Sequence, residues 1–180
     1  MSEAVHADRN ARWLSDRINA SNLQTSQHIW RLIDENYVPI DWQLDFKSGY
    51  RWDEKTWSRN VSISPRPGVD IKVPWELARC QHFPQLALAF AAMRFSGEQD
   101  EKCDHVAGEF RNQVLDFLAL NPPRFGVHWQ CSMDVGIRIA NWLIAYDLFS
   151  AAGVEWDDDF HSVFASSVYE HGQHIVNNLE

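Results

Sequence analysis

Apolar side chains recur at helical spacing from residue 74 to the end of the chain, with no alternation typical of a β-strand. Gly97, Asn121 before two prolines, and Gly153 are typical of positions where helices end. Pro74 suits the first position of a helix, and Pro84 should break or kink the chain before the next apolar run. The pattern predicts helices over residues 75–80, 86–95, 106–118, 127–149 and 160–179, the last of them capped by Asp157 to Asp159.

The first 73 residues follow a different pattern. Two apolar groups within residues 11–36 predict two short helices, the second with Thr25 or Ser26 as its N-cap. Over residues 37–73, proline and glycine interrupt every periodicity, and aromatic residues are interleaved with charged ones. We expect a long irregular arm here, which either has a binding role or wraps over a core through its aromatic side chains.

These segments predict an all-α fold in a single domain over residues 1–180. Short helices occupy residues 1–36, the irregular aromatic-rich arm occupies 37–73, and antiparallel helical hairpins occupy 74–180. A chain of 180 residues, of which 45% are hydrophobic, is long enough to bury a core without disulfides or metals.

Charge and tryptophan content narrow the classes of partner. The chain has 16 basic and 25 acidic side chains, a formal net charge of −9, which disfavours a basic surface for nucleic acid or for lipid headgroups. Any polyanion must be met by a local cluster of basic side chains. The nine tryptophans suit either core packing or a concave site, because each indole N–H needs a partner.

The N-terminal residues lack the basic and apolar blocks of a secretory signal, and no apolar run reaches the 18 or so residues of a membrane span. The sequence therefore predicts no membrane association and a cytoplasmic location, or a periplasmic one if a leader has been removed. Cys80, Cys103 and Cys131 match no zinc spacing and leave one thiol over in any disulfide scheme. We expect buried, reduced thiols and no cofactor.

Two histidines, His171 and His174, lie three residues apart on a predicted helix. A metal site would need a third ligand at a fixed spacing, and the sequence offers none, so we predict no metal and interpret both as polar residues on the helix surface.

Polar residues interrupt the apolar helix predicted after residue 127. Asp134, Arg138 and Trp142 share one helical stripe, and Asn141 lies on the adjacent stripe with Trp129. Burial of such side chains is unfavourable unless they are paired or face a wet cleft. Two readings therefore stay open, a structural Asp134–Arg138 pair or a ligand groove.

A second group of charged and aromatic residues lies earlier in the chain, on the helix predicted after Pro74. Glu76 and Arg79 are spaced i, i+3, with Trp75 on the same helical face as Arg79.

These motifs, in their order along the chain, resemble the N-terminal helical domain of the heparinase II/III-like polysaccharide lyases. The matching stretches span about residues 37–180. They are Ile40-Asp-Trp42 with Asp45 and Ser48-Gly49, Asp70 to Arg79, Asn121-Pro with Gly126 to Trp129, Met133 to Arg138, Asn141-Trp142, and His171 to Glu180.

The resemblance implies an incomplete (α/α) toroid whose inner helices line a groove for acidic polysaccharide, followed in full-length members by more helices and a β-sandwich. Family chemistry is β-elimination at a uronic acid, and the catalytic Asn, His and Tyr region of the family lies beyond Glu180. The chain is therefore expected to have no catalytic residues and to be inactive by itself. The resemblance carries over only substrate-binding residues: His128, Trp129, Arg138, Asn141, Trp75, Glu76 and Arg79.

An alternative is a non-catalytic helical module that binds a glycan or a protein. In either case an interrupted toroid would leave the apolar residues of its last helix uncovered, and exposed apolar patches drive association. We therefore expect a homo-oligomer formed through an open helical edge. The residues expected to be exposed there are Phe160, Val163, Phe164 and Ile175.

Overall fold

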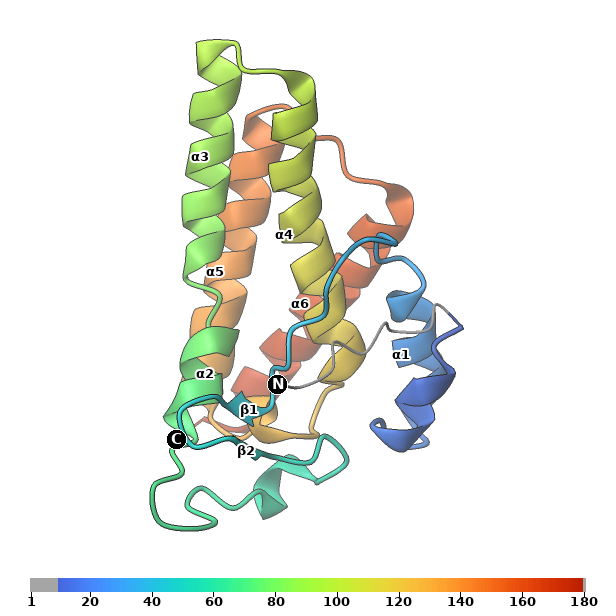
Figure 1. The fold of residues 1–180 in the computed structure, drawn as a ribbon, viewed down its shortest axis with the longest axis vertical. Helices are drawn as coiled ribbons and strands as arrows, with labels where there is room; N and C mark the ends of the chain where they lie inside the picture. Colours follow the sequence, from blue (N-terminus) through green and yellow to red (C-terminus); the bar gives the residue numbers. More distant parts are fainter. Residues whose placement is uncertain (1–9, 180) are drawn as a thin grey trace. The chain divides into compact units, whose positions relative to one another are not determined.

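The computed structural model describes residues 10–179 and is mainly helical, which confirms the predicted fold class (Figure 1). The chain divides into two compact units. Unit 1 contains residues 10–74 and 112–130, and unit 2 contains residues 75–111 and 131–179. The elements in chain order are η1 (Arg12–Asp16), α1 (Leu23–Trp30), β1 (Leu44–Asp45), β2 (Tyr50–Arg51), η2 (Ser58–Asn60), α2 (Lys72–Ala78), α3 (His82–Ser96), α4 (Asp100–Leu120), η3 (Val127–Trp129), α5 (Ser132–Ala151) and α6 (Asp158–Asn177).

Several helix ends follow the sequence signals. Gly97 ends α3 in the left-handed conformation, with φ of 75°. The Asp157 side chain caps α6 by accepting a hydrogen bond of 2.9 Å from the backbone N–H of Phe160. The N-cap predicted for α1 is wrong, because the helix begins at Leu23 after Asn22 rather than at Thr25 or Ser26.

Both proline predictions are wrong in detail. Helix α2 begins at Lys72, whose N–H donates to the Asp70 carboxylate over 2.9 Å, so Pro74 is the third residue rather than the first. Pro84 does not break a helix. It lies in the first turn of α3, where a missing N–H leaves no intrahelical bond unmade. The break falls earlier, at Cys80, which has a φ of 51°.

The helix predicted over 127–149 is two elements. The 3₁₀ turn η3 is followed by the extended residue Cys131, and α5 begins only at Ser132. Helix α4 is longer than predicted, because Asp100 and Glu101 extend its first turn, where negative charge is favourable to the helix dipole.

In unit 2, ring contacts give the helix directions. Phe83 and Phe90 of α3 contact Trp142 and Phe149 of α5 in the same order, so these two helices are parallel. Helices α5 and α6 are antiparallel, since Trp142 contacts His171 while the later residue Phe149 contacts Trp156, which precedes α6 (Figure 1). The predicted hairpin of antiparallel helices is thus present in α5 and α6. Closure toward a toroid stays a prediction.

The core of unit 1 is built around the second half of α4. Trp42 of the arm and His128 of η3 both contact the ring of Phe117. The arm contains one small antiparallel hairpin, in which Leu44 pairs with Arg51 and Asp45 pairs with Tyr50. The rest of the arm is irregular, as predicted, and it is anchored by its aromatic side chains.

The apolar residues expected to be exposed on the last helix are mostly covered. Phe160 and Phe164 are buried, and Val163 and Ile175 are half-buried, because the ring cluster of unit 2 encloses the first half of α6. The exposed apolar side chains of α6 and the residues after it are Tyr169, Val176 and Leu179. Among residues 10–179, no helix is long and apolar enough to cross a membrane.

Candidate functional site

The seven residues that the resemblance suggested for substrate binding fall in two groups, one in each unit. Trp75, Glu76, Arg79, Arg138 and Asn141 belong to unit 2, and His128 and Trp129 belong to unit 1.

Arg79 is the centre of the group in unit 2. Its Nε donates to Oδ1 of Asp134 over 2.6 Å, and its Nη1 donates to Oε1 of Glu76 over 2.5 Å. The amide of Asn141 donates to the carbonyl oxygen of Arg79 over 2.8 Å. The hydrogen bond to Asp134 raises the pKa of Arg79, so the guanidinium stays charged between two carboxylates. Glu76 and half-buried Trp75 lie at the outer side of this group.

The hydrogen-bonded partner of Asp134 is Arg79, while Asp134 acts on Arg138 only through its charge, which raises the pKa of Arg138. The side chain of Arg138 is 0% exposed, and its Nε donates over 3.0 Å to Nε2 of His171 on α6. The i, i+4 spacing within α5 was compatible with a hydrogen-bonded pair, but Asp134 binds Arg79, which lies directly after α2. Burial lowers the pKa of Arg138 to about 10.

His171 is buried, which corrects the interpretation of this residue as a surface histidine. Because an arginine can only donate, Nε2 of His171 is the acceptor, and its Nδ1–H donates to the carbonyl oxygen of Ser167 over 2.7 Å. Burial, followed by the charge of Arg138, lowers the pKa of His171 well below its usual value. Sequence reasoning placed His171 in a family motif but had no signal for its partner.

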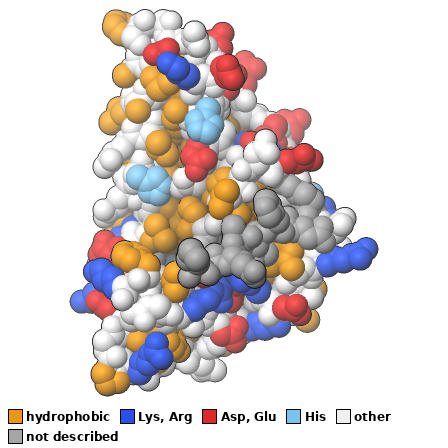
Figure 2. All heavy atoms as spheres, viewed as in Figure 1, with side chains coloured by type: hydrophobic (Ala, Val, Ile, Leu, Met, Phe, Trp, Pro, Cys, Tyr) orange, Lys and Arg blue, Asp and Glu red, His pale blue; other side chains and the backbone are white. Residues whose placement is uncertain are grey.

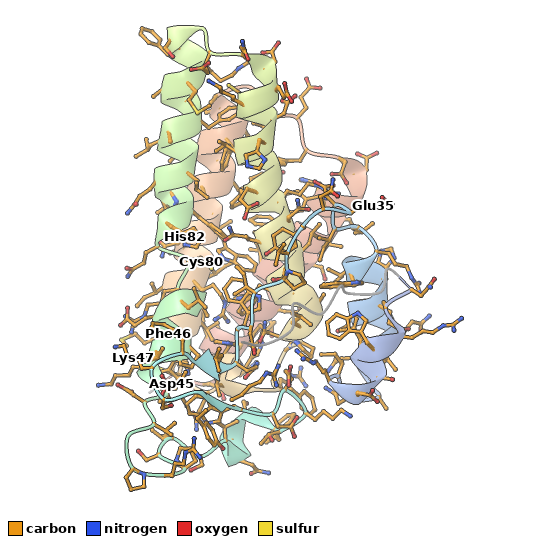
Figure 3. The ribbon with its side chains drawn as sticks, viewed as in Figure 1. Glu35, Asp45, Phe46, Lys47, Cys80 and His82 are labelled. Carbon is orange, nitrogen blue, oxygen red and sulfur yellow. The ribbon has the colours of Figure 1, made fainter. Side chains whose placement is uncertain are left out.

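Cys80 lies at the sharp connection between α2 and α3 (Figure 3), where its thiol interacts with the charge of Arg138. Burial raises the pKa of its thiol to about 12, while the charge of Arg138 acts in the opposite direction, and the thiol donates to the carbonyl oxygen of Ala78 over 3.5 Å. The thiol is therefore protonated and inert. Cys80 and Cys103 are buried, as expected, whereas Cys131 is partly exposed.

The two candidates of unit 1 are held by backbone carbonyls. The ring of His128 hydrogen-bonds through Nε2 to the carbonyl oxygen of Trp42 over 2.8 Å. The indole N–H of Trp129 donates to the carbonyl oxygen of Asn121 over 2.9 Å. Both side chains are buried. The hydrogen bond of His128 holds the arm at Trp42, and that of Trp129 holds the turn after α4 at Asn121.

Asp116 is a polar residue of unit 1 that sequence reasoning missed. Its Oδ2 accepts hydrogen bonds from the Tyr37 hydroxyl, the backbone N–H of Ile40 and the indole N–H of Trp42, at 3.0 to 3.1 Å. Burial raises its pKa to about 7, and these three donors offset only part of that rise. A carboxylate within an otherwise apolar stretch of α4 was the available signal.

The described residues contain no group of three or more His, Cys, Asp or Glu side chains that could hold a metal ion. The polar groups of both units are instead arranged for hydrogen bonding between elements. The solvent-facing part of the unit 2 group consists of Glu76, Arg79 and Trp75, which together offer a carboxylate, a guanidinium and an indole.

Comparison with known proteins places the chain in a family. The family described as Heparinase II/III N-terminus matches residues 8–180, which is nearly the whole chain. No match was found among curated proteins or among solved structures. Since the match covers both units, the chain belongs to the heparinase II/III N-terminal family.

Proposed function

We propose that this domain contributes the substrate-binding surface of a polysaccharide lyase that cleaves uronic-acid-containing glycans by β-elimination. The observation that carries this proposal is the family match over residues 8–180. The resemblance of the motifs around Asp70 to Arg79 and Met133 to Asn141 supports the same conclusion.

Within unit 2, the partly exposed side chains of Trp75 and Arg79 support glycan binding. Indole rings pack on sugar faces, and a guanidinium binds a carboxylate or sulfate through two parallel hydrogen bonds. Trp75 and Arg79 lie on one turn of α2 and its continuation, and Asn141 holds the backbone of Arg79. Arg138 supports these residues without contacting a ligand, because it is buried and its hydrogen bond to His171 joins α5 to α6.

Proton transfer is not expected from this chain. β-Elimination needs a base at the C5 proton and an acid at the leaving oxygen. His128 and His171 are both buried and engaged by other groups of their own units, so neither can reach a substrate. We expect the chain to bind acidic glycan and to release no unsaturated uronate.

The test is a calorimetric titration of the purified chain with hyaluronan, alginate and heparan sulfate oligosaccharides, with a neutral cello-oligosaccharide as control. The expected result is binding of an acidic oligosaccharide that weakens as salt is raised, without product absorbance. Equal affinity for the neutral oligosaccharide, or no binding of any glycan, contradicts the proposal.

The second candidate function is a protein-interaction module, and a specific observation favours it. Several large apolar side chains are exposed on α5 and on α6 with the residues that follow: Met133, Ile144, Tyr169, Val176 and Leu179. Exposed apolar patches favour association. Under this candidate, light scattering shows concentration-dependent self-association that Val176→Lys weakens and Ser162→Lys, at another exposed position of α6, does not.

A further inference from the structure

Charge is divided unevenly between the two units. The described residues of unit 1 include ten basic and nine acidic side chains, whereas those of unit 2 include five basic and thirteen acidic ones. Within unit 1, residues 46–68 of the arm contain five basic and two acidic residues. A polyanion is attracted by local positive potential, so the arm is the better place for it.

The five basic side chains of unit 2 are already engaged. Arg138 is buried against His171, and Arg79 lies between two carboxylates. The other three form ion pairs over 2.6 to 3.0 Å: Arg94 with Asp100, Arg111 with Asp157, and Lys102 with Glu98. A sulfate or carboxylate that binds at Arg79 has to displace the exposed carboxylate of Glu76, so it gains less free energy there than at a cation that forms no ion pair.

Unit 1 differs from unit 2 because some of its exposed basic side chains form no ion pair within residues 10–179. Arg51 is held by Asp41 and Glu54, but the exposed residues Lys55 and Arg124 form no ion pair with a carboxylate of residues 10–179. Figure 2 shows several Lys and Arg side chains on the surface in the lower part of the view, where the arm lies. Glu54, which is adjacent to Lys55 in sequence, is bound by Arg51, and the carboxylate of Asp53 accepts from the backbone N–H of Lys55.

Lys55 and Arg124 flank an exposed aromatic residue. Trp57 has 39% of its surface exposed and is the one tryptophan, of nine within residues 10–179, that is classed as exposed. Its ring packs edge-on against Phe125 at 5.3 Å between centroids, which fixes its orientation.

Two backbone segments hold this ring in place. Ser58 N–H donates to the carbonyl oxygen of Arg124 over 2.9 Å, and Gly126 N–H donates to that of Thr56 over 2.8 Å. With the Trp57–Phe125 bridge, these bonds make a two-segment strap of residues 56–58 and 124–126, which we call the Trp57 strap.

Arg124 itself is in a strained conformation. Its φ is 74°, in the left-handed region that favours glycine, although its side chain is exposed and takes no part in the core. Residues other than glycine held in this region often lie at functional sites, where the surrounding structure maintains the strain. Glycine would adopt this backbone conformation without strain, so Arg124→Gly separates the side chain's contribution from that of the backbone.

We propose that the Trp57 strap is a binding subsite for one acidic sugar residue of a polyanionic glycan, with Trp57 packed on the sugar face and Arg124, assisted by Lys55, bound to the carboxylate or sulfate. This inference rests on the proposed function, since it assumes an acidic glycan as the ligand. It adds a subsite in unit 1 that the family motifs did not indicate. Binding there needs no existing ion pair to be broken.

The test compares Arg124→Gly with Arg31→Ala in the full chain. Arg124→Gly removes the cation and relieves the strained φ, while Arg31→Ala removes one exposed cation that directly follows α1 in the same unit. The probes are a hyaluronan decasaccharide, which carries carboxylates alone, and a heparin decasaccharide, which also carries sulfates. Calorimetry gives the Kd, and differential scanning calorimetry gives the Tm.

We expect Arg124→Gly to weaken binding of the preferred oligosaccharide about tenfold or more and to raise the Tm, whereas Arg31→Ala changes the Kd less than about twofold. Trp57→Leu should weaken binding while retaining contact with Phe125. If the wild type binds and Arg124→Gly binds equally well, the subsite is refuted and the proposed function stands. If the wild type binds neither decasaccharide, both are refuted.

Discussion

Nε of Arg138 donates a hydrogen bond to Nε2 of His171 across 3.0 Å, and both side chains are fully buried between α5 and α6. This bond fixes the imidazole as neutral, because a proton on Nε2 would point at the guanidinium. The pair therefore links the packing of two helices to the protonation of one ring.

The first prediction concerns acid sensitivity. The pKa of His171 in the folded state lies well below 6.5, so its stabilising contribution is complete above pH 6.5 and is lost as the pH falls below that value. The loss is about 1.4 kcal/mol per pH unit until the folded-state pKa is reached. His171→Gln, which can still accept from Arg138, should lack this part of the pH dependence. Urea unfolding at pH 5.0 to 8.0 measures it, and parallel curves for variant and wild type would contradict the prediction.

The second prediction has the opposite sign. The pKa of Asp116 is about 7 in the folded state, against an ordinary value of 3.8 for aspartate, so folding takes up a proton at a pH between these values. Stability from this group is greatest at low pH and declines as the pH rises from about 4 to 7. The free energy of unfolding of Asp116→Asn minus that of the wild type should therefore be larger at pH 8 than at pH 4.5. The check is the same urea series, and a difference that does not vary with pH would refute the assignment of this proton to Asp116.

The third prediction compares the two carboxylates that bind Arg79. Asp134 is 4% exposed and Glu76 is 56% exposed in their side chains. Asp134→Asn should destabilise the fold by about 2 to 3 kcal/mol, because it weakens a buried, charged hydrogen bond. Glu76→Gln should change the free energy of unfolding by less than about 1 kcal/mol, because exposed ion pairs contribute little. Equal effects in chemical unfolding would mean that burial does not distinguish the two.

The fourth prediction concerns the turn after α4. Gly126 has a φ of 71°, and an added Cβ would lie 2.8 Å from Nε2 of Gln43. Gly153 has a φ of 98° with open space around it. Both Gly→Ala variants incur backbone strain, but only Gly126→Ala also displaces the Gln43 amide from Asn121, which it reaches over 2.7 Å. Gly126→Ala should lower the Tm more than Gly153→Ala by several degrees, and the reverse order would contradict this account.

The sequence predicted the helical class, the end of α3 and the start of α6, because these depend on local chemistry. Gly97 and Asp157 act within one turn of their own position, and both signals were correct. The break at Cys80 was missed because nothing local marks a cysteine for the left-handed conformation. The break predicted at Pro84 was wrong because proline is also tolerated in the first turn of a helix, where Pro84 lies.

Site partners were harder to predict than helices. The pair of Glu76 with Arg79 was predictable because it is local in sequence. Arg79 with Asp134, and Arg138 with His171, join residues 55 and 33 positions apart, and helical spacing carries no information on such pairs. Asp116 and Arg124 were overlooked because their importance lies in burial and in backbone conformation, neither of which a residue type reveals.

The interleaved order of the two units has a consequence for synthesis and for fragment design. Each unit takes two separate stretches of chain, and α4 supplies residues to both. During translation the first unit is complete only when Gln130 has left the ribosome, after all of α3 and α4 has emerged, and the second unit is complete only after α6. No single cut in the chain separates one unit intact from the other. A cut in the exposed turn at Gly153 interrupts neither α5 nor α6, whereas a truncation at the same point removes Phe160 and Phe164 from the core of unit 2.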